Sequence, residues 1–195
     1  MFELAANPAG HTIDIQPFPA NRGVTSTTMD LYILRHAIAE PRTGLLPRGD
    51  SQRELTIEGA GKMRRVAQGM RAAKLSFEAV LSSPYVRARQ TAEIVADEFV
   101  LTQKLELVAA LAPDGSPEEL IQLLNRDFSG RKSVLLVGHE PYLGRLISVL
   151  LTGGVNLAVN MRKAALCHLS IEELRWDRCA TLEFLLTPGL AKRLG

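Results

Sequence analysis

The sequence predicts an α/β protein built as a three-layer α/β/α sandwich around a mixed, mostly parallel sheet. Short apolar runs typical of buried strands alternate along the chain with segments whose apolar residues recur at helical spacing. Such alternation favours a parallel sheet with helices on both faces. Near the C-terminus, two strand-like runs follow each other with no helix between them, which predicts a hairpin and makes the sheet mixed.

Five strands are expected, each from a short apolar run. Their ranges are 31–34, 79–81, 133–137, 164–171 and 182–186. The run at 133–137 is the most apolar of them, which is typical of a strand buried on both faces. The last two runs are the expected hairpin.

The helices between the strands are indicated by capping residues and periodicity. Thr56 is expected to cap a helix whose apolar positions are Ile57, Ala60, Met63, Ala67 and Met70. Ser83 as N-cap and Pro84 as first helical residue predict a second helix to about residue 99. Ser116-Pro117-Glu118-Glu119 has the pattern of a capping box and opens a third helix, and a fourth runs from about 141 to 151.

Length and composition predict one main domain. The chain has 195 residues, 46% hydrophobic and 23% charged, which is ordinary for a globular protein. Residues 1–28 contain several prolines and glycines without periodicity, so we expect a disordered or loosely attached tail followed by a domain at 29–195. Met29 directly precedes the first strand and is a candidate translation start.

Charge and patterning exclude several classes of protein. The formal net charge of +2 does not indicate a nucleic-acid partner. No apolar run approaches the ~18 residues of a membrane span, and the N-terminus lacks the pattern of a secretory signal. Cys167 and Cys179 match no metal-ligand spacing, so we expect a cytoplasmic protein without a bound metal. The sequence does not determine the oligomeric state.

Two histidines lie where ligands bind in proteins of this class. His36 follows Arg35 at the end of the first strand, and His139 follows Gly138 at the end of the strand at 133–137. In an open α/β sheet, ligands bind at the carboxyl ends of the strands. We therefore expect the two imidazoles to share one pocket.

The neighbouring arginines indicate phosphate chemistry. A neutral, oriented imidazole can attack phosphorus, and arginine presents a planar fork to phosphate oxygens. Arg35 is next to His36. Arg87 lies in the first turn of a predicted helix, where a cation opposes the helix dipole at a cost of ~0.3–1 kcal/mol that a bound anion would remove. The alternative is that Arg87 pairs with a surface carboxylate.

These segments together resemble the histidine phosphatase superfamily, the phosphoglycerate-mutase-like enzymes. Leu34-Arg35-His36-Ala37 is similar to the Arg-His motif of that family, and Val137-Gly138-His139-Glu140-Pro141 to its second-histidine motif. The second-arginine segment is matched by Ser82-Ser83-Pro84-Tyr85-Val86-Arg87-Ala88-Arg89-Gln90-Thr91-Ala92. In that match Arg87, and not Arg89, takes the place of the phosphate-binding arginine.

Within the superfamily the chain most resembles the small SixA-type phosphohistidine phosphatases, over roughly 29–188. The segment Arg53-Glu54-Leu55-Thr56-Ile57-Glu58-Gly59 is similar to their Arg-x-Leu-Thr-x-x-Gly segment. Larger relatives carry a glutamate general acid in a Leu-x-Glu context, whereas this chain has Leu111-Ala112-Pro113. SixA-type enzymes share the absence of that acid.

The resemblance implies a metal-independent, two-step reaction. His36 attacks the phosphoryl group, while Arg35, Arg87 and a protonated or hydrogen-bonding His139 hold its oxygens. Water then hydrolyses the phosphohistidine intermediate. Arg53 is expected to bind phosphate or to line the entrance. The expected substrate is a phosphohistidine-containing protein, because an imidazole leaving group can carry its own proton and needs less help from an acid.

Several alternatives stay open at this stage. Asp114, Glu118 or Glu140 would supply an acid if its loop folds inward. The same scaffold also suits a small-molecule or broad-specificity phosphomonoesterase, or a non-catalytic phosphate-binding adaptor. His168 is expected to be a packed or surface residue of a strand. Lys62, Arg64 and Arg65 are expected on the solvated face of a helix, from which they could also dock an acidic protein substrate.

Overall fold

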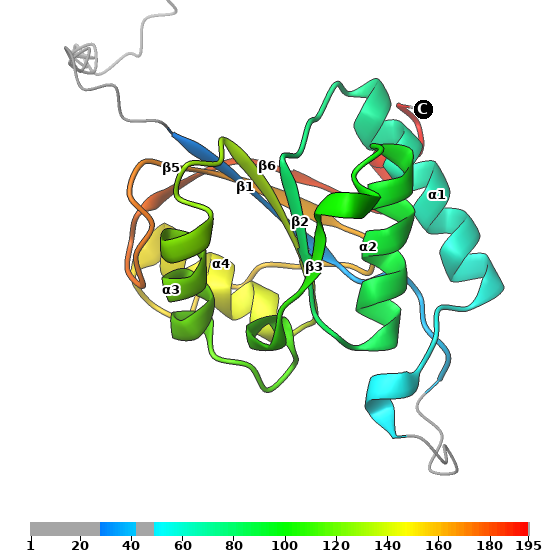
Figure 1. Cartoon of the computed structure of the whole chain (residues 1–195), viewed down its shortest axis with the longest axis horizontal. Helices are drawn as coiled ribbons and strands as arrows, with labels where there is room; N and C mark the ends of the chain where they lie inside the picture. The colour runs from blue at the N-terminus through cyan, green and yellow to red at the C-terminus, as the bar shows by residue number, and fades with distance from the viewer. Residues whose placement is uncertain (1–27, 42–48, 195) are drawn as a thin grey trace, which may run out of the picture.

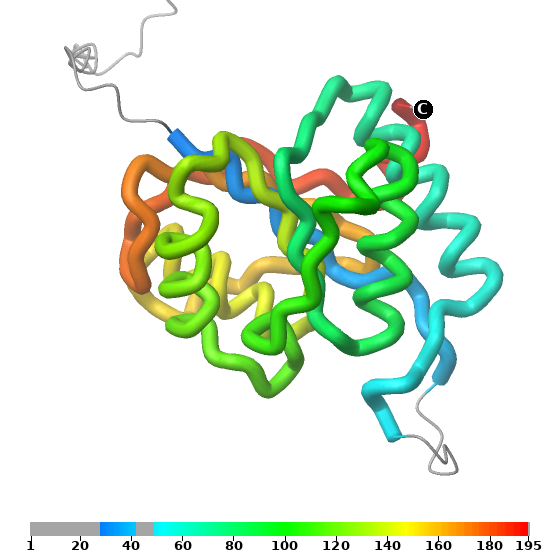
Figure 2. Tube along the Cα trace, viewed as in Figure 1, coloured from blue at the N-terminus to red at the C-terminus, as the bar shows by residue number. Residues whose placement is uncertain are grey.

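The computed structural model describes residues 28–41 and 49–194, which form a six-stranded sheet covered by helices on both faces (Figures 1 and 2). The strand order is β3-β2-β4-β1-β5-β6. The tail predicted at 1–28 lies, apart from Thr28, outside the described residues. In the two described ranges, no helix is long and apolar enough to cross a membrane.

The sheet is mixed and mostly parallel, as predicted. Four parallel strands, β1 (Met29–Arg35), β2 (Ala79–Ser82), β3 (Leu105–Leu107) and β4 (Ser133–Gly138), form one side. The hairpin of β5 (Leu166–Ile171) and β6 (Ala180–Leu186) pairs antiparallel through β5 with β1. The sequence analysis missed β3, an edge strand of three partly exposed residues that leaves almost no apolar pattern to detect.

The helices make the two outer layers of the predicted sandwich (Figure 1). One layer contains α1 (Ile57–Ala72), α2 (Val86–Glu98) and the short α5 (Pro188–Ala191), and the other contains α3 (Pro117–Asp127) and α4 (Tyr142–Thr152). Alternate residues of β1 serve the two cores: Leu31 and Ile33 pack with α3 and α4, whereas Tyr32 and Leu34 pack with α1 and α2. The central strand is therefore apolar on both faces. Three short 3₁₀ segments, Asp50–Gln52, Thr102–Lys104 and Ala109–Leu111, lie in the connections.

Two of the three predicted N-caps are confirmed and one is wrong, while the fourth helix, expected from about 141, begins at Tyr142. The Thr56 hydroxyl accepts the Gly59 N–H at 2.9 Å, and the Ser116 hydroxyl accepts the Glu119 N–H at 3.2 Å. Helix α2, by contrast, begins at Val86 with Tyr85 as its N-cap, and not at Pro84. The Ser83 hydroxyl is instead engaged by a histidine of the candidate site, described below.

Of the predicted apolar positions of α1, Met63, Ala67 and Met70 are buried and Ala60 is half-buried, but Ile57 is not. The helix buries Gly59, Met63, Val66, Ala67, Gly69 and Met70, but Ile57 is 95% exposed. At 3.6 residues per turn, Ile57 lies roughly 150° around the helix axis from the centre of the buried stripe. The three-residue spacing between Ile57 and Ala60 correctly predicts a helix, but it does not place Ile57 on the buried face.

Strand register brings the carboxyl ends of three strands to one edge of the sheet. Arg35 is opposite Gly138, and Ser82 is opposite Val137. Just beyond the strands, the His36 N–H donates to the Gly138 carbonyl at 3.0 Å. The residues that follow β1, β2 and β4 therefore meet at one place.

Candidate active site

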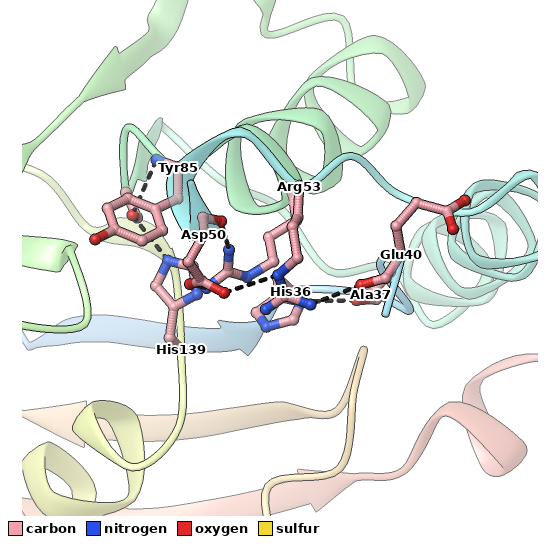
Figure 3. Close-up of polar contacts among 9 residues, drawn as sticks. His36, Ala37, Glu40, Asp50, Arg53, Tyr85 and His139 are labelled. Carbon is pink, nitrogen blue, oxygen red and sulfur yellow. Dashed lines mark hydrogen bonds and ion pairs between the residues drawn. The ribbon is translucent and has the colours of Figure 1, made fainter. Parts of the chain in front are cut away.

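His36 and His139 lie side by side at the carboxyl ends of β1 and β4 (Figure 3). Their ring centroids are 5.0 Å apart, and the side chains are nearly inaccessible, with 6% and 2% exposure. The structure thus brings together two imidazoles that are separated by about half of the chain, as the strand-end argument predicts.

His36 is held in one tautomer and in its neutral form. Its Nδ1 lies 2.7 Å from the Ala37 carbonyl oxygen, and because a carbonyl can only accept, Nδ1 carries the hydrogen. Nε2 then keeps its lone pair. Burial lowers the pKa of His36 to about 4, partly opposed by the Ala37 hydrogen bond and reinforced by the charges of Arg87, Arg35 and Lys163. A neutral imidazole with a free Nε2 is what a nucleophile at phosphorus requires.

His139 is oriented by Ser83. Its Nε2 lies 2.8 Å from the Ser83 hydroxyl oxygen, which also accepts the Tyr85 N–H at 3.3 Å. The hydroxyl hydrogen is free to donate to Nε2, and with that donation the ring hydrogen of His139 lies on Nδ1. Burial, followed by the influence of His36 and Arg87, lowers the pKa of His139 to about 3. Of the two forms considered for His139, the structure favours the neutral hydrogen-bonding one.

Arg35 and Arg87 are both anchored through their terminal nitrogens. Arg35 Nη1 donates to the Met161 carbonyl at 2.7 Å. Arg87 Nη1 donates to the Asp50 carbonyl at 2.7 Å, and its Nη2 to the Asp50 carboxylate at 3.0 Å. Arg87 thus pairs with a carboxylate, as the alternative interpretation held, but it is 3% exposed and lies at the site rather than on the open surface.

Asp50 is the residue of this site that sequence reasoning missed. Its carboxylate accepts from Arg87 Nη2 at 3.0 Å. It also accepts from Arg53 Nε at 2.8 Å (Figure 3). Arg53 also donates from Nη1 to the Glu40 carbonyl at 2.7 Å. Asp50 therefore links Arg53 to the phosphate-site arginine. The available signal was local: Asp50 stands three residues before Arg53, the first residue of the segment that resembles the family.

The carboxylates of the three candidate acids have different contacts. Glu118 accepts the Ser116 hydroxyl at 3.3 Å at the start of α3, which is a capping contact. Glu140 follows His139, but its carboxylate accepts the Gly144 N–H at 3.3 Å in the first turn of α4. Burial raises the pKa of Glu140. Asp114 lines a cavity of about 660 Å³ between α3 and α4 together with Arg145.

The remaining histidine of the described chain belongs to the core. His168 Nε2 lies 2.8 Å from the Asp30 carboxylate, and its ring stacks on Tyr32 at 4.3 Å between centroids. This matches the packed role expected for it. Within residues 28–41 and 49–194, no group of three or more His, Cys, Asp or Glu side chains could hold a metal ion.

The protonation states of the two site histidines can be checked by NMR. We expect both imidazoles to stay neutral down to about pH 5, with the hydrogen on Nδ1, because burial lowers their pKa values to about 4 and about 3. Their ordinary value is 6.5. Below pH 6.5 the unfolded chain then binds more protons than the native one, so the free energy of unfolding should fall as the pH drops towards 4. Long-range ¹H–¹⁵N spectra report the tautomers, and a site histidine that titrates near 6.5 would contradict the assignment.

Comparison with known proteins agrees with this geometry. Residues 31–112 match the Histidine phosphatase superfamily (branch 1). An uncharacterized protein of Picosynechococcus sp. is 37% identical over 142 residues, 72% of this chain and 84% of that protein. The phosphohistidine phosphatase SixA of Escherichia coli K12 is 34% identical over 128 residues, 64% of this chain and 76% of that protein.

Solved structures show the same relationship. The structure of the protein histidine phosphatase SixA complexed with tungstate has a TM-score of 0.70 and 29% identity, covering 83% of this chain and 98% of that one. A phosphoglycerate mutase of Bacillus anthracis has the same fold, with a TM-score of 0.58 and 15% identity over 86% of this chain and 96% of that one. The phosphoglycerate-mutase-like fold is therefore confirmed, and with it the sequence matches show that this chain belongs to the histidine phosphatase superfamily.

Proposed function

We propose that this protein is a phosphohistidine phosphatase that works through a covalent phospho-His36 intermediate. The observation that carries the proposal is a set of buried nitrogens without partners. Arg35 Nε, Arg87 Nε and His139 Nδ1 are all buried and have no hydrogen-bond partner among the described residues. Buried donors are costly unless they are satisfied. A tetrahedral oxyanion bound beside His36 would supply acceptors for all three.

In the proposed first step, His36 Nε2 attacks phosphorus in line with the leaving group. A bond forms between His36 Nε2 and phosphorus, and the bond from phosphorus to the substrate imidazole breaks. The substrate imidazole leaves as a neutral ring, because its other nitrogen already carries a hydrogen. Arg35, Arg87 and the His139 Nδ1–H donate to the equatorial oxygens. In the second step, the oxygen of water attacks phosphorus and the bond from phosphorus to His36 breaks. Inorganic phosphate leaves with the oxygen and protons of the water, and His36 returns to its neutral form. The arginines supply the positive charge, so the scheme needs no metal.

The surroundings of the leaving group favour a phosphoramidate over a phosphate monoester. An alkoxide leaving group benefits by ~10²–10⁴-fold from a general acid. Here Pro113 stands where the larger relatives have glutamate, and the Glu140 carboxylate is held by the start of α4. The similarity to the phosphohistidine phosphatase SixA supports the same substrate class. We infer a phosphohistidine-containing protein as the substrate and the reducing cytoplasm, suited to the two free cysteines, as the setting.

A comparison of substrates tests the proposal. We expect kcat/KM for a phosphohistidine peptide to exceed that for p-nitrophenyl phosphate or a sugar phosphate by ~10²-fold or more, since the monoesters lack an acid. Equal or higher values for the monoesters would favour the small-molecule phosphomonoesterase. Binding of the phosphopeptide without any turnover would favour the adaptor.

A further inference from the structure

A small cavity next to His36 is lined by three lysines from distant parts of the chain. Its volume is about 180 Å³. Lys62 comes from α1, Lys163 from the segment before β5, and Lys192 from the end of α5. The other lining residues are Ala37, Ile38, Gly59, Ala164 and Pro188.

The cavity lies next to the backbone that carries the candidate active site. Ala37, which lines it, accepts the His36 ring hydrogen through its carbonyl. The Ala164 N–H, next to Lys163, lies 3.1 Å from the Arg35 carbonyl and 3.3 Å from the His36 carbonyl. The charge of Lys163 also contributes to the lowered pKa of His36. The cavity is therefore close enough to His36 for a residue that flanks the phosphohistidine of a protein substrate to reach it.

The lysines of the cavity carry more positive charge than the surrounding carboxylates neutralise. Lys62 pairs with Glu58, one turn earlier on α1. Lys163 and Lys192 form no ion pair with any of the described carboxylates. Like charges gathered around one cavity repel each other, and a bound anion removes that cost. Arg35 and Arg87 are expected to bind the phosphoryl group of the substrate. The lysines of the cavity are therefore available to bind a second anionic group.

We propose that this cavity is a subsite for an acidic side chain of the protein substrate, close in space to its phosphohistidine. The inference rests on the proposed function, because it concerns what surrounds the phosphohistidine. Lysine suits such a role, since its flexible stem can follow carboxylates at somewhat different positions. The apolar walls formed by Ala37, Ile38 and Pro188 strengthen the attraction by excluding water.

Two synthetic phosphohistidine peptides that differ only in their flanking residues, Glu in one and Gln in the other, test the subsite. We expect the wild-type protein to show about tenfold higher kcat/KM for the Glu peptide at low salt, as a few partly exposed ion pairs would produce. The preference should shrink at ~1 M salt, where the Debye length is ~3 Å. The double variant Lys163→Gln/Lys192→Gln should lose the preference and keep its kcat/KM for the Gln peptide within about twofold.

Lys104→Gln is the matched control. Lys104 is exposed and precedes β3, at the amino ends of the parallel strands and thus at the edge opposite the site, so the preference should persist. Equal kcat/KM for the two peptides in the wild-type protein would overturn the subsite, and so would a preference that survives in the double variant. If the proposed function is wrong, the wild-type protein will hydrolyse neither peptide, and the proposed subsite will be wrong as well. If only the subsite is wrong, the protein will hydrolyse both peptides without the preference described above.

Discussion

His36→Ala is expected to abolish the covalent phosphoenzyme and to lower turnover by at least ~10⁴-fold, as removal of a catalytic nucleophile does in other enzymes. The reason is that His36 Nε2 holds the free lone pair at the site, since Nδ1 donates to Ala37. Rapid-quench trapping with a ³²P-labelled phosphohistidine peptide measures the intermediate directly. The label on the wild-type protein should be acid-labile and base-stable, as a phosphoramidate is.

His168→Gln provides the matched control for this experiment. His168 lies on β5, pairs with Asp30 and stacks on Tyr32, away from the contacts of His36. The variant should form the phosphoenzyme to the same extent as the wild-type protein once folded protein is quantified. Full labelling of His36→Ala would show that another residue is the nucleophile.

Arg87→Ala is expected to lower kcat/KM by ~10²–10³-fold, the usual cost of removing a group that stabilises charge in the transition state. It should also weaken inhibition by inorganic phosphate, because the Arg87 Nε–H is one of the three unpartnered donors. Steady-state kinetics and phosphate inhibition measure the two effects. Thermal unfolding of the same sample shows how much of the protein is folded, which matters because Arg87 is buried and holds Asp50.

Arg89→Ala is the control for Arg87→Ala, because it removes another arginine side chain, two residues further along α2. Arg89 is exposed and lies 3.6 Å from Glu93 in an ordinary surface pair. Its loss should change kcat/KM by less than about twofold, as surface pairs contribute little. If the two substitutions change kcat/KM equally, or if Arg87→Ala leaves it unchanged, then Arg87 does not bind the phosphoryl group at the start of α2.

Much of the fold could be predicted from two local properties of the sequence, the spacing of apolar residues and the capping residues of helices. Alternation along β1 sends Leu31 and Ile33 to one core and Tyr32 and Leu34 to the other, so a run of apolar residues predicts a central strand. Thr56 and Ser116 cap helices because their hydroxyls have a nearby backbone N–H to accept. The same logic was wrong at Ser83, because its hydroxyl accepts the Tyr85 N–H and also contacts the distant His139, while the helix begins only at Val86.

Apart from β3 and the start of α2, the sequence by itself determined the strand and helix pattern and placed His36 and His139 at strand ends, since hydrophobic periodicity and capping are short-range properties. Tertiary structure alone decided that Asp50 links Arg53 to Arg87 and that Lys62, Lys163 and Lys192 surround one cavity. Their convergence depends on how α1, α2, α5 and the connecting segments pack around the sheet. A burial-lowered pKa is likewise a property of the assembled core, because desolvation exists only after the chain has folded.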